Sequence, residues 1–256
     1  LGSAAILARQ SYELPHTAIF SSELLQEYFE KTETGVFAEG RGDGRQRSVA
    51  IRNAITPIGP VNADELRHPG KKRLIFYARP EEHAARNLFE IGTMALDKAL
   101  AEGHFRGWDI CAIGNVDLGH GTLTLPDSGV SLTLIPRESE ARYAETLKSA
   151  EVGLSLMGTP HPSLVPIEMA SAGLVTVTNT FENKDEAALT AISGNLLAAS
   201  PSVIEVAAAL VEAEIRSQDF DVRAGNSEVD WPSSWASALD EEKMDAIEAL
   251  LGGDPP

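Results

Sequence analysis

The sequence predicts an α/β protein whose larger part is a doubly wound parallel sheet of the Rossmann-like kind. Apolar and β-branched runs of strand length recur at residues 74–77, 109–113, 152–157 and 174–179, and segments with helical periodicity lie between them. Strands that are apolar throughout are buried on both faces, which is typical of parallel sheets covered by helices. Strands that alternate with helices over this length favour a doubly wound sheet.

The elements of this sheet follow from local signals. Residues 87–102 carry apolar side chains at helical spacing, Met94 among them, so a helix with these side chains inward is expected. Residues 168–173 are mostly small and end at a glycine, which predicts a short helix that begins at Glu168. The Gly-rich residues 114–129 are expected to form a loop. The predicted strands are residues 74–77, 109–113, 132–135, 152–157, 174–179 and 195–198, and the predicted helices are residues 87–102, 142–150, 168–173, 185–190 and 202–217.

A smaller α/β part precedes the sheet. Residues 17–20 are apolar and predict a strand, and Ser22 is placed to cap a helix over residues 23–31. A second short strand is expected at residues 48–51. The polar, Gly-rich residues 35–47 are not followed by a helical pattern, so they favour a surface loop over a phosphate cradle.

The two prolines within residues 56–64 indicate a linker. The expected division is therefore a residual part of a first α/β domain with the linker at residues 1–62, the main domain at residues 63–225, and a C-terminal tail with a final amphipathic helix at residues 226–256. The chain begins with Leu1 rather than methionine, and we expect further residues to precede it.

The composition argues against several classes of partner and site. The net charge of −17 disfavours nucleic acids and anionic membranes as main partners, because both reward a basic surface. The single cysteine, Cys111, excludes an internal disulfide and a multi-cysteine metal site, and its apolar neighbours predict a packed side chain rather than a nucleophile. No run approaches the ~18 apolar residues of a membrane span, and no secretory start is present, so a cytoplasmic location is expected.

Four side chains lie near the expected carboxyl ends of strands. Arg79 follows a buried strand and Arg86 comes seven residues later, so both could clamp a pyrophosphate or both could be ordinary surface ion-pair residues. Glu168 could accept hydrogen bonds from two ribose hydroxyls or simply complement a helix dipole. His161 could donate to a sugar hydroxyl, act as a general acid or base, or be a plain loop residue. Together they define a candidate nucleotide site at one edge of the sheet.

Two further pairs of residues resemble functional or structural motifs. Asp117 and His120 resemble a metal or acid/base pair, but the glycines around them and the lack of a third spaced ligand favour a turn without metal. Trp231 and Trp235 are four residues apart, one helical turn, and are expected to be packing residues for the C-terminal helix.

The candidate residues lie in motifs that follow one another along the chain. These are Tyr-Ala-Arg-Pro at residues 77–80, Arg-Asn-Leu-Phe-Glu-Ile-Gly at residues 86–92, His-Pro-Ser at residues 161–163, Pro-Ile-Glu-Met-Ala at residues 166–170 and Thr-Asn-Thr at residues 178–180. In combination they resemble the donor-binding half of GT-B glycosyltransferases, and most of all the WsaF-type rhamnosyltransferases of a large family of retaining enzymes. The resemblance spans most of the chain.

The resemblance implies roles for individual residues. Arg79 and Arg86 match the basic pair that holds the diphosphate of a nucleotide sugar. Glu168 matches the second of two glutamates that lie eight residues apart in the family, and this second glutamate binds the ribose. Asn87 and Ser163 belong to the same motifs and are included among the donor-binding residues.

One position departs from the family pattern. Pro160 stands where the first glutamate is expected, and in the wider family that glutamate usually contacts the donor sugar. His161 or a backbone amide nearby is the expected replacement, which makes His161 the candidate catalytic residue. No Asp-x-Asp motif is present, so the resemblance implies a metal-independent site without a cofactor other than the donor substrate.

The resemblance implies a glycosyltransferase that moves a sugar, with rhamnose from a dTDP donor as the expected case, to a polysaccharide, glycan or lipid-linked acceptor. Residues 1–62 are then the tail of an acceptor-binding domain, and the helical tail at residues 226–256 crosses back to it. Two alternatives stay open. One is a non-catalytic module that binds a sugar nucleotide or glycan, which Pro160 favours; the other is a nucleotide-sugar epimerase of the same fold.

Overall fold

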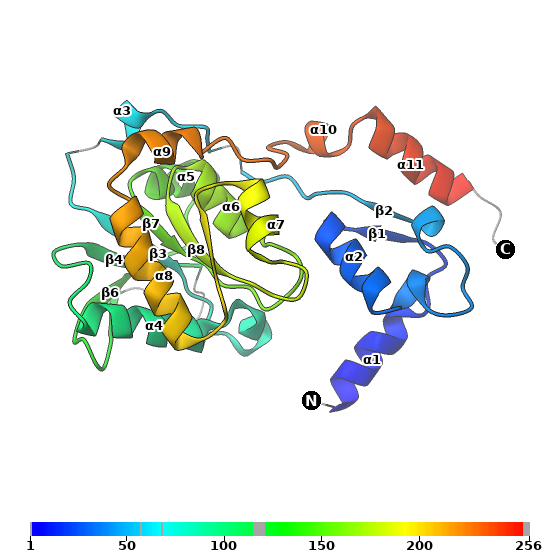
Figure 1. Cartoon of the computed structure of the whole chain (residues 1–256), viewed down its shortest axis with the longest axis horizontal. Coiled ribbons are helices and arrows are strands. Elements are labelled where there is room, and N and C mark those ends of the chain that lie inside the picture. Colours follow the sequence, from blue (N-terminus) through cyan, green and yellow to red (C-terminus); the bar gives the residue numbers. More distant parts are fainter. Residues whose placement is uncertain (1, 57, 68, 115–120, 253–256) are drawn as a thin grey trace. The chain divides into compact units, whose positions relative to one another are not determined.

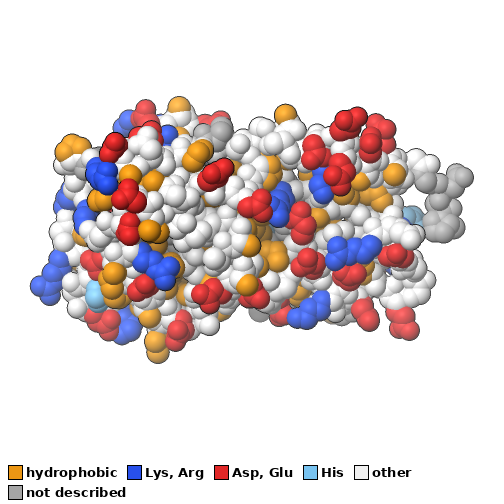
Figure 2. Space-filling model, turned by 45° about the horizontal axis from the view of Figure 1, so that its top comes forward, with side chains coloured by type: hydrophobic (Ala, Val, Ile, Leu, Met, Phe, Trp, Pro, Cys, Tyr) orange, Lys and Arg blue, Asp and Glu red, His pale blue; other side chains and the backbone are white. Residues whose placement is uncertain are grey.

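A computed structural model describes residues 2–56, 58–67, 69–114 and 121–252 of the chain. The chain forms two compact units, one of residues 1–54 with 232–256 and one of residues 55–231, here called unit 1 and unit 2 (Figure 1). None of the helices in the described residues combines the length and apolar character that a membrane crossing needs. On the face shown in Figure 2, acidic side chains are interspersed among the basic ones, as the net charge of −17 leads one to expect.

Unit 2 is built on a seven-stranded sheet in the order β5-β6-β4-β3-β7-β8-β9. All neighbouring strands are parallel except β5, which is antiparallel to β6. The doubly wound parallel sheet predicted from the sequence is confirmed. The strands are β3 (Arg73–Tyr77), β4 (Asp109–Ile113), β5 (Gly121–Thr124), β6 (Ser131–Leu134), β7 (Val152–Leu154), β8 (Val175–Asn179) and β9 (Leu196–Ala199).

Helices cover both faces of this sheet because alternate strand residues are apolar on both sides (Figure 1). In β3, Leu74 and Phe76 enter one buried cluster with residues of α4 (Phe89–Ala101) and α8 (Val203–Arg216). Ile75 enters the cluster on the other face. That face is covered by α5 (Glu140–Lys148), α6 (Leu164–Ser171) and α7 (Glu186–Ile192). Cys111 is buried in the same cluster as Ile75, as its apolar neighbours predicted.

One buried guanidinium holds the amino edge of the sheet together. Arg223, in α9 (Phe220–Gly225), is 1% exposed, and its Nε, Nη1 and Nη2 donate to the carbonyl oxygens of Gly173, Ser217 and Ala150 at 2.7, 3.0 and 3.1 Å. These carbonyls lie at the C-terminal ends of α6, α8 and α5, where backbone acceptors have no partner within the helix. Burial lowers the pKa of Arg223 to about 10. Beside α9 lies the short α3 (Ala63–Leu66), which begins at the end of the predicted linker.

Unit 1 is a small α/β body. Its two parallel strands, β1 (Ala18–Phe20) and β2 (Ser48–Ala50), pack with α2 (Glu23–Lys31), and the Ser22 side chain accepts from the N–H of Leu25 as the predicted cap. The other elements of unit 1 are the helix α1 (Gly2–Tyr12), the 3-10 turns η1 (Gly35–Phe37) and η2 (Arg45–Arg47), α10 (Trp235–Ala238) and α11 (Glu241–Gly252). Helix α11 contacts β2.

Four sequence-based expectations are wrong. The predicted loop at residues 114–129 contains β5, which pairs with β6 although most of its side chains are exposed. Met94 points outward and is 57% exposed. The two tryptophans are not a pair in one helix: Trp231 is buried in a cluster of unit 2, whereas Trp235 opens α10 in unit 1 and is 57% exposed. Glu168 does not begin its helix, because α6 starts at Leu164.

Candidate functional site

The sheet order reverses between β3 and β7. From β3 the chain builds outward through β4 to β6, and it then returns to the other side of β3 to add β7, β8 and β9. Open α/β sheets bind ligands outside the carboxyl ends of the strands that flank such a reversal. The segments at this position are residues 78–88, which follow β3, and residues 155–163, which follow β7. They form the candidate site.

The two segments are joined by a backbone hydrogen bond. The N–H of Gly158 donates to the carbonyl oxygen of Arg86 at 2.7 Å. Met157, which precedes Gly158, is bound to the end of β8, because its N–H donates to Oδ1 of Asn179 at 2.6 Å. The carbonyl oxygen of Met157 accepts from Nδ2 of Asn179 at 3.2 Å and from Nζ of Lys184 at 2.6 Å. The loops that follow β3, β7 and β8 are therefore one hydrogen-bonded assembly.

Lys184 is the unusual member of this assembly. It is 0% exposed, and the Met157 carbonyl is the acceptor found for its ammonium among the described residues. Burial lowers the pKa of Lys184 to about 7, because an ammonium loses its hydration there. Asn179 is the last residue of β8 and Lys184 lies in the loop after it, but neither was predicted as a site residue. A lone lysine between a strand and a helix gives no sequence signal that distinguishes it from an exposed one.

The N-terminus of α6 points its first amides into this edge without a side-chain cap. The cap residue Ser163 makes no side-chain hydrogen bond to the helix and has φ 71° and ψ 148°, a strained conformation for a residue other than glycine. Among the described residues, no acceptor is found for the N–H groups of Leu164 and Val165. Pro166, in the same turn, has no N–H to satisfy. Two backbone donors and the positive end of the helix dipole are thus available at the reversal point.

His161 is placed by the same turn. Its Nδ1 accepts from the N–H of Ser163 at 2.9 Å, so the neutral imidazole carries its proton on Nε2. The ring packs edge-on against Trp231, with 6.2 Å between ring centroids. His161 is half-buried, and Pro160 beside it is buried. The imidazole is therefore fixed as an Nε2–H donor in this segment.

Arg79 and Arg86 differ in whether a carboxylate already neutralises the charge of the guanidinium. Nε of Arg79 donates to Oε2 of Glu81 at 2.8 Å, and Nη1 donates to the Tyr77 hydroxyl at 3.2 Å. The Glu81 side chain is only 2% exposed, and its hydrogen bond, followed by that of Tyr77, raises the pKa of Arg79 above its ordinary value. Arg86 is exposed, and no ion pair is found for its side chain within the described residues. Arg86 is the more available of the two cations.

Asn87 has a structural contact in this segment. It ends the 3-10 helix η3 (Glu82–Asn87), is 3% exposed, and donates through Nδ2 to the carbonyl oxygen of Ala84 at 2.9 Å. The next residue, Leu88, is left-handed with φ 50° and opens α4. Asn87 thus stabilises the turn that presents Arg86.

Glu168 lies one turn inside α6, with both carboxylate oxygens engaged. Oε1 accepts from the N–H of Thr56 at 2.9 Å, and Oε2 accepts from the hydroxyl of Tyr143 in α5 at 2.8 Å. Glu168 is 8% exposed. Burial, followed by the neighbouring Glu168 carboxylate, raises the pKa of Tyr143, so the phenol stays protonated as a donor. The carboxylate therefore ties α6 to α5 and to the linker.

The structure brings five of the six predicted site residues to two adjacent loops. Arg79, Arg86 and Asn87 follow β3, and His161 and Ser163 follow β7. Glu168 lies on the same helix as the free amides but faces α5 and residue 56. Asp117 and His120 lie outside the described residues. In the described part of the chain, no three His, Cys, Asp or Glu side chains gather as ligands for a metal ion.

Residues 72–211 match the protein family described as WsaF, C-terminal domain, and this region is more than half of the 256-residue chain. The chain belongs to this family. The resemblance inferred from the motifs is therefore confirmed at the level of the family. The region that matches the WsaF C-terminal domain begins just before β3 and ends within α8, so it contains all six predicted site residues.

Other known proteins are similar over longer stretches. The O-antigen biosynthesis protein RfbC of Myxococcus xanthus is 29% identical over 262 residues, which cover 93% of this chain and 17% of that protein. The structure of WaaG, a glycosyltransferase involved in lipopolysaccharide biosynthesis, superposes with a TM-score of 0.58 at 14% identity, over 92% of this chain and 62% of WaaG. HepE of Anabaena in complex with UDP-glucose gives a TM-score of 0.59 at 13% identity, over 98% of this chain and 68% of HepE.

The WsaF C-terminal domain in this chain therefore has the fold of the C-terminal domain of GT-B glycosyltransferases. This chain spans about a sixth of the length of RfbC and about three fifths of WaaG.

Proposed function

We propose that this chain is the donor-binding half of a glycosyltransferase that acts in the synthesis of a surface polysaccharide. Unit 2 binds a nucleoside-diphosphate sugar across the carboxyl ends of β3 and β7. Membership of the WsaF C-terminal domain family supports this, as do the names of two similar proteins, one of O-antigen and one of lipopolysaccharide biosynthesis. HepE, of similar fold, is known with UDP-glucose bound.

The observation that carries the proposal is the open N-terminus of α6 at the reversal point. The N–H groups of Leu164 and Val165 have no acceptor among the described residues, and the strained Ser163 directs the chain into the helix. Backbone amides at a helix N-terminus are a favourable site for phosphate, because the donors and the helix dipole both attract negative charge. The diphosphate of the donor is the ligand with this chemistry.

Arg86 and Arg79 are proposed to contribute differently to binding of the diphosphate. Arg86 is exposed, and its backbone carbonyl is bonded to Gly158 in the segment that leads into α6, so we propose that its guanidinium binds a phosphate directly. Arg79 is already paired with the buried Glu81, and we assign it a smaller share of the diphosphate charge. The amides and Arg86 supply the positive charge that a departing diphosphate requires, so the reaction is proposed to be metal-independent.

Glu168 is proposed to bind the ribose while it keeps its present contacts. Each carboxylate oxygen has two lone pairs, and Thr56 and Tyr143 use one on each. His161 is proposed to serve as a donor to the sugar through its Nε2–H, in the place of the glutamate that Pro160 replaces; Nε2 is buried in this structure, so the ring has to turn outward when the donor binds. This donor is the candidate catalytic group.

The finer assignment follows the WsaF resemblance. We propose rhamnose, carried by dTDP, as the sugar, a growing glycan or lipid-linked saccharide as the acceptor, and the cytoplasm as the location. Residues 1–62 are proposed to be the tail of the acceptor-binding domain and residues 226–256 a helical tail that belongs with it. Nucleic acid is not proposed as a partner, given the net charge of −17.

Calorimetry with dTDP and UDP tests the site. Arg86→Ala is expected to weaken binding at least tenfold, because hydrogen bonds to a charged group contribute about 1.5–3 kcal/mol. The matched control is Arg106→Ala, which removes an exposed arginine whose Nε donates to the Gly103 carbonyl near the start of β4. Equal affinities for the two variants would show that the diphosphate does not bind beside Arg86.

Pro160 favours a second candidate, a non-catalytic module that binds a nucleotide sugar without transferring it. A carboxylate is absent from the position where the wider family contacts the sugar, and Pro160 is buried. Incubation of the whole protein with dTDP-rhamnose separates the two functions. Slow hydrolysis of the donor without acceptor supports the transferase, and tight binding with neither hydrolysis nor transfer supports the module.

A further inference from the structure

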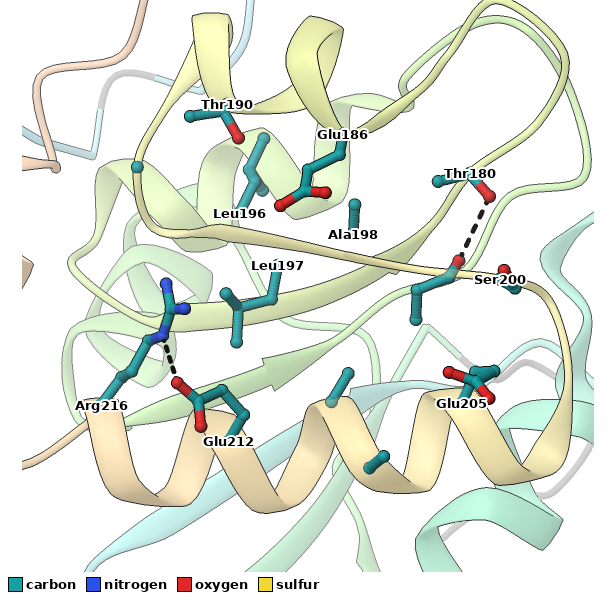
Figure 3. A pocket seen from close by; sticks show the side chains of 14 residues that line it. Thr180, Glu186, Thr190, Leu196, Leu197, Ala198, Ser200, Glu205, Glu212 and Arg216 are labelled. Atoms are coloured by element: carbon teal, nitrogen blue, oxygen red, sulfur yellow. Dashed lines mark hydrogen bonds and ion pairs between the residues drawn. The ribbon is translucent and has the colours of Figure 1, made fainter.

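The last strand of the sheet, β9, borders a groove that the proposed donor site does not use. The groove has a volume of about 600 Å³ and runs along the outer side of β9 between α7 and α8 (Figure 3). The backbone of residues 196–200 forms its floor. Helix α7 contributes Glu186 and Thr190 to one wall, and α8 contributes Glu205 and Glu212 to the other.

The floor of the groove presents backbone groups for which no partner is found in the described part of the chain. The N–H of Thr176 donates to the carbonyl of Asn195 at 2.7 Å, and the N–H of Thr180 donates to that of Ala199 at 2.9 Å. In a parallel pair, alternate residues of a strand direct both backbone groups to the same neighbour. Residues 195, 197 and 199 therefore bond to β8, and Ala198, which lies opposite Thr178, directs its N–H and C=O to the open side. The carbonyl of Leu196 faces the same way.

The edge lacks the usual protection against strand addition. Natural edge strands carry a lysine, a proline or a bulge, or are covered by another element. The sequence of β9 is Leu-Leu-Ala-Ala, with no charge and no proline. The two helices stand on either side of the edge and leave it open.

Three glutamates and one arginine, Arg216, line the walls of the groove, which makes the walls acidic on balance. Glu186 and Glu205 are exposed and have no ion pair among the described residues, whereas Glu212 pairs with Arg216 at 2.8 Å. Side chains of an extended strand point alternately to opposite faces. A strand paired with β9 would direct one set of side chains toward Glu186 and the other toward Glu205.

We propose that the β9 groove binds an extended, basic peptide segment of a partner protein by strand addition. The backbone of Ala198 and the carbonyl of Leu196 hold the peptide in register, and lysine or arginine side chains of the peptide face Glu186 on one wall and Glu205 on the other. Such recognition takes affinity from main-chain hydrogen bonds and specificity from alternate side chains. This partner is independent of the donor site.

Fluorescence anisotropy with a labelled peptide, acetyl-Thr-Lys-Arg-Val-Lys-Arg-Thr-amide, tests the proposal, because an extended strand of this sequence has basic side chains on both faces. Saturable binding is expected, at least tenfold weaker for the same peptide N-methylated at alternate residues and for a version with glutamate in place of each basic residue. The double variant Glu186→Gln, Glu205→Gln is expected to bind at least fivefold more weakly, and Glu140→Gln with Glu145→Gln on α5 serves as the matched control. Ala198→Pro, which removes the central N–H, gives a second variant.

Two results would overturn the proposal. One is equal binding of the basic, acidic and N-methylated peptides, or equal binding by the glutamine variant and its control. The other is self-association of the chain in sedimentation that Ala198→Pro abolishes, since a second copy of β9 would then be the occupant.

Discussion

Replacement of Lys184 by methionine provides a quantitative test of how the loop assembly is built. The variant keeps the length and the apolar stem of the side chain and removes a fully buried ammonium. Burial lowers the pKa of Lys184 from 10.5 to about 7. Between these values the unfolded chain binds more protons than the folded one, so the free energy of unfolding of the wild type must rise as the pH rises.

The expected size follows from the two pKa values. One pKa unit corresponds to about 1.4 kcal/mol, so the full effect of the charge is on the order of 5 kcal/mol. Between pH 7 and pH 9 the unfolded lysine stays charged while the folded one becomes neutral. The wild type should therefore gain about 2 kcal/mol of stability relative to Lys184→Met over this range. The Met157 carbonyl keeps Nδ2 of Asn179 as a donor in the variant, so unit 2 should still fold.

Urea unfolding followed by tryptophan fluorescence measures this difference. A Trp235→Phe background removes the tryptophan of unit 1, so that Trp108 and Trp231 report on unit 2 alone. Lys148→Met, which removes an exposed lysine of α5, is the control and should show no such pH dependence. If the free energy of unfolding changes with pH in the same way for the wild type and for Lys184→Met, the pKa of Lys184 is not lowered and its ammonium is not buried.

Two further substitutions test the packing of unit 2, both by urea unfolding in the same background. Arg223→Met should lower the free energy of unfolding by roughly 3 kcal/mol or more, because it leaves three buried helix-end carbonyls without a donor; a loss below 1 kcal/mol would contradict the role assigned to this guanidinium. Gly92→Ala should cost about 1–3 kcal/mol, since a Cβ would lie 2.8 Å from the buried ring of Phe76. Gly225→Ala in α9, where a Cβ meets nothing within 4 Å, is its control and should be neutral or stabilising.

The sheet could be predicted because its central strands are apolar throughout. Buried parallel strands such as β3 and β8 give continuous apolar runs whose length and β-branched content distinguish them from helices. Strand β5 has no such signal: it lies at the edge, has a glycine and two threonines, and is mostly exposed. Only its pairing with β6, which depends on tertiary structure, makes it a strand.

The start of α6 was misplaced for a local reason. The prolines at positions 162 and 166 favour a turn that continues as far as Glu168. Proline is tolerated in the first turn of a helix, because its missing N–H would have no acceptor there. The helix could therefore start at Leu164 and include Pro166. The correct start is what exposes the two free amides on which the proposed site depends.

The partners of the site residues could not be predicted, because they are distant in sequence. Glu168 accepts from Thr56, which lies 112 residues before it. The pair of Arg79 and Glu81 is local, but burial of Glu81 to 2% is a property of the folded edge. The strand ends thus predict where the charged residues lie. They do not predict how far each charge is already neutralised by a partner in the folded chain.

Titration of the ¹⁵N-labelled chain with dTDP, followed by NMR, tests the central claim most directly. We expect saturable shifts of the amide signals of Gly158, Leu164 and Val165, which lie at the reversal point between β3 and β7. The signals of Gly173 and Arg223 at the amino edge should stay unchanged. Shifts confined to the amino edge, or no saturable shift with dTDP, UDP or GDP, would contradict a nucleoside-diphosphate site at the N-terminus of α6.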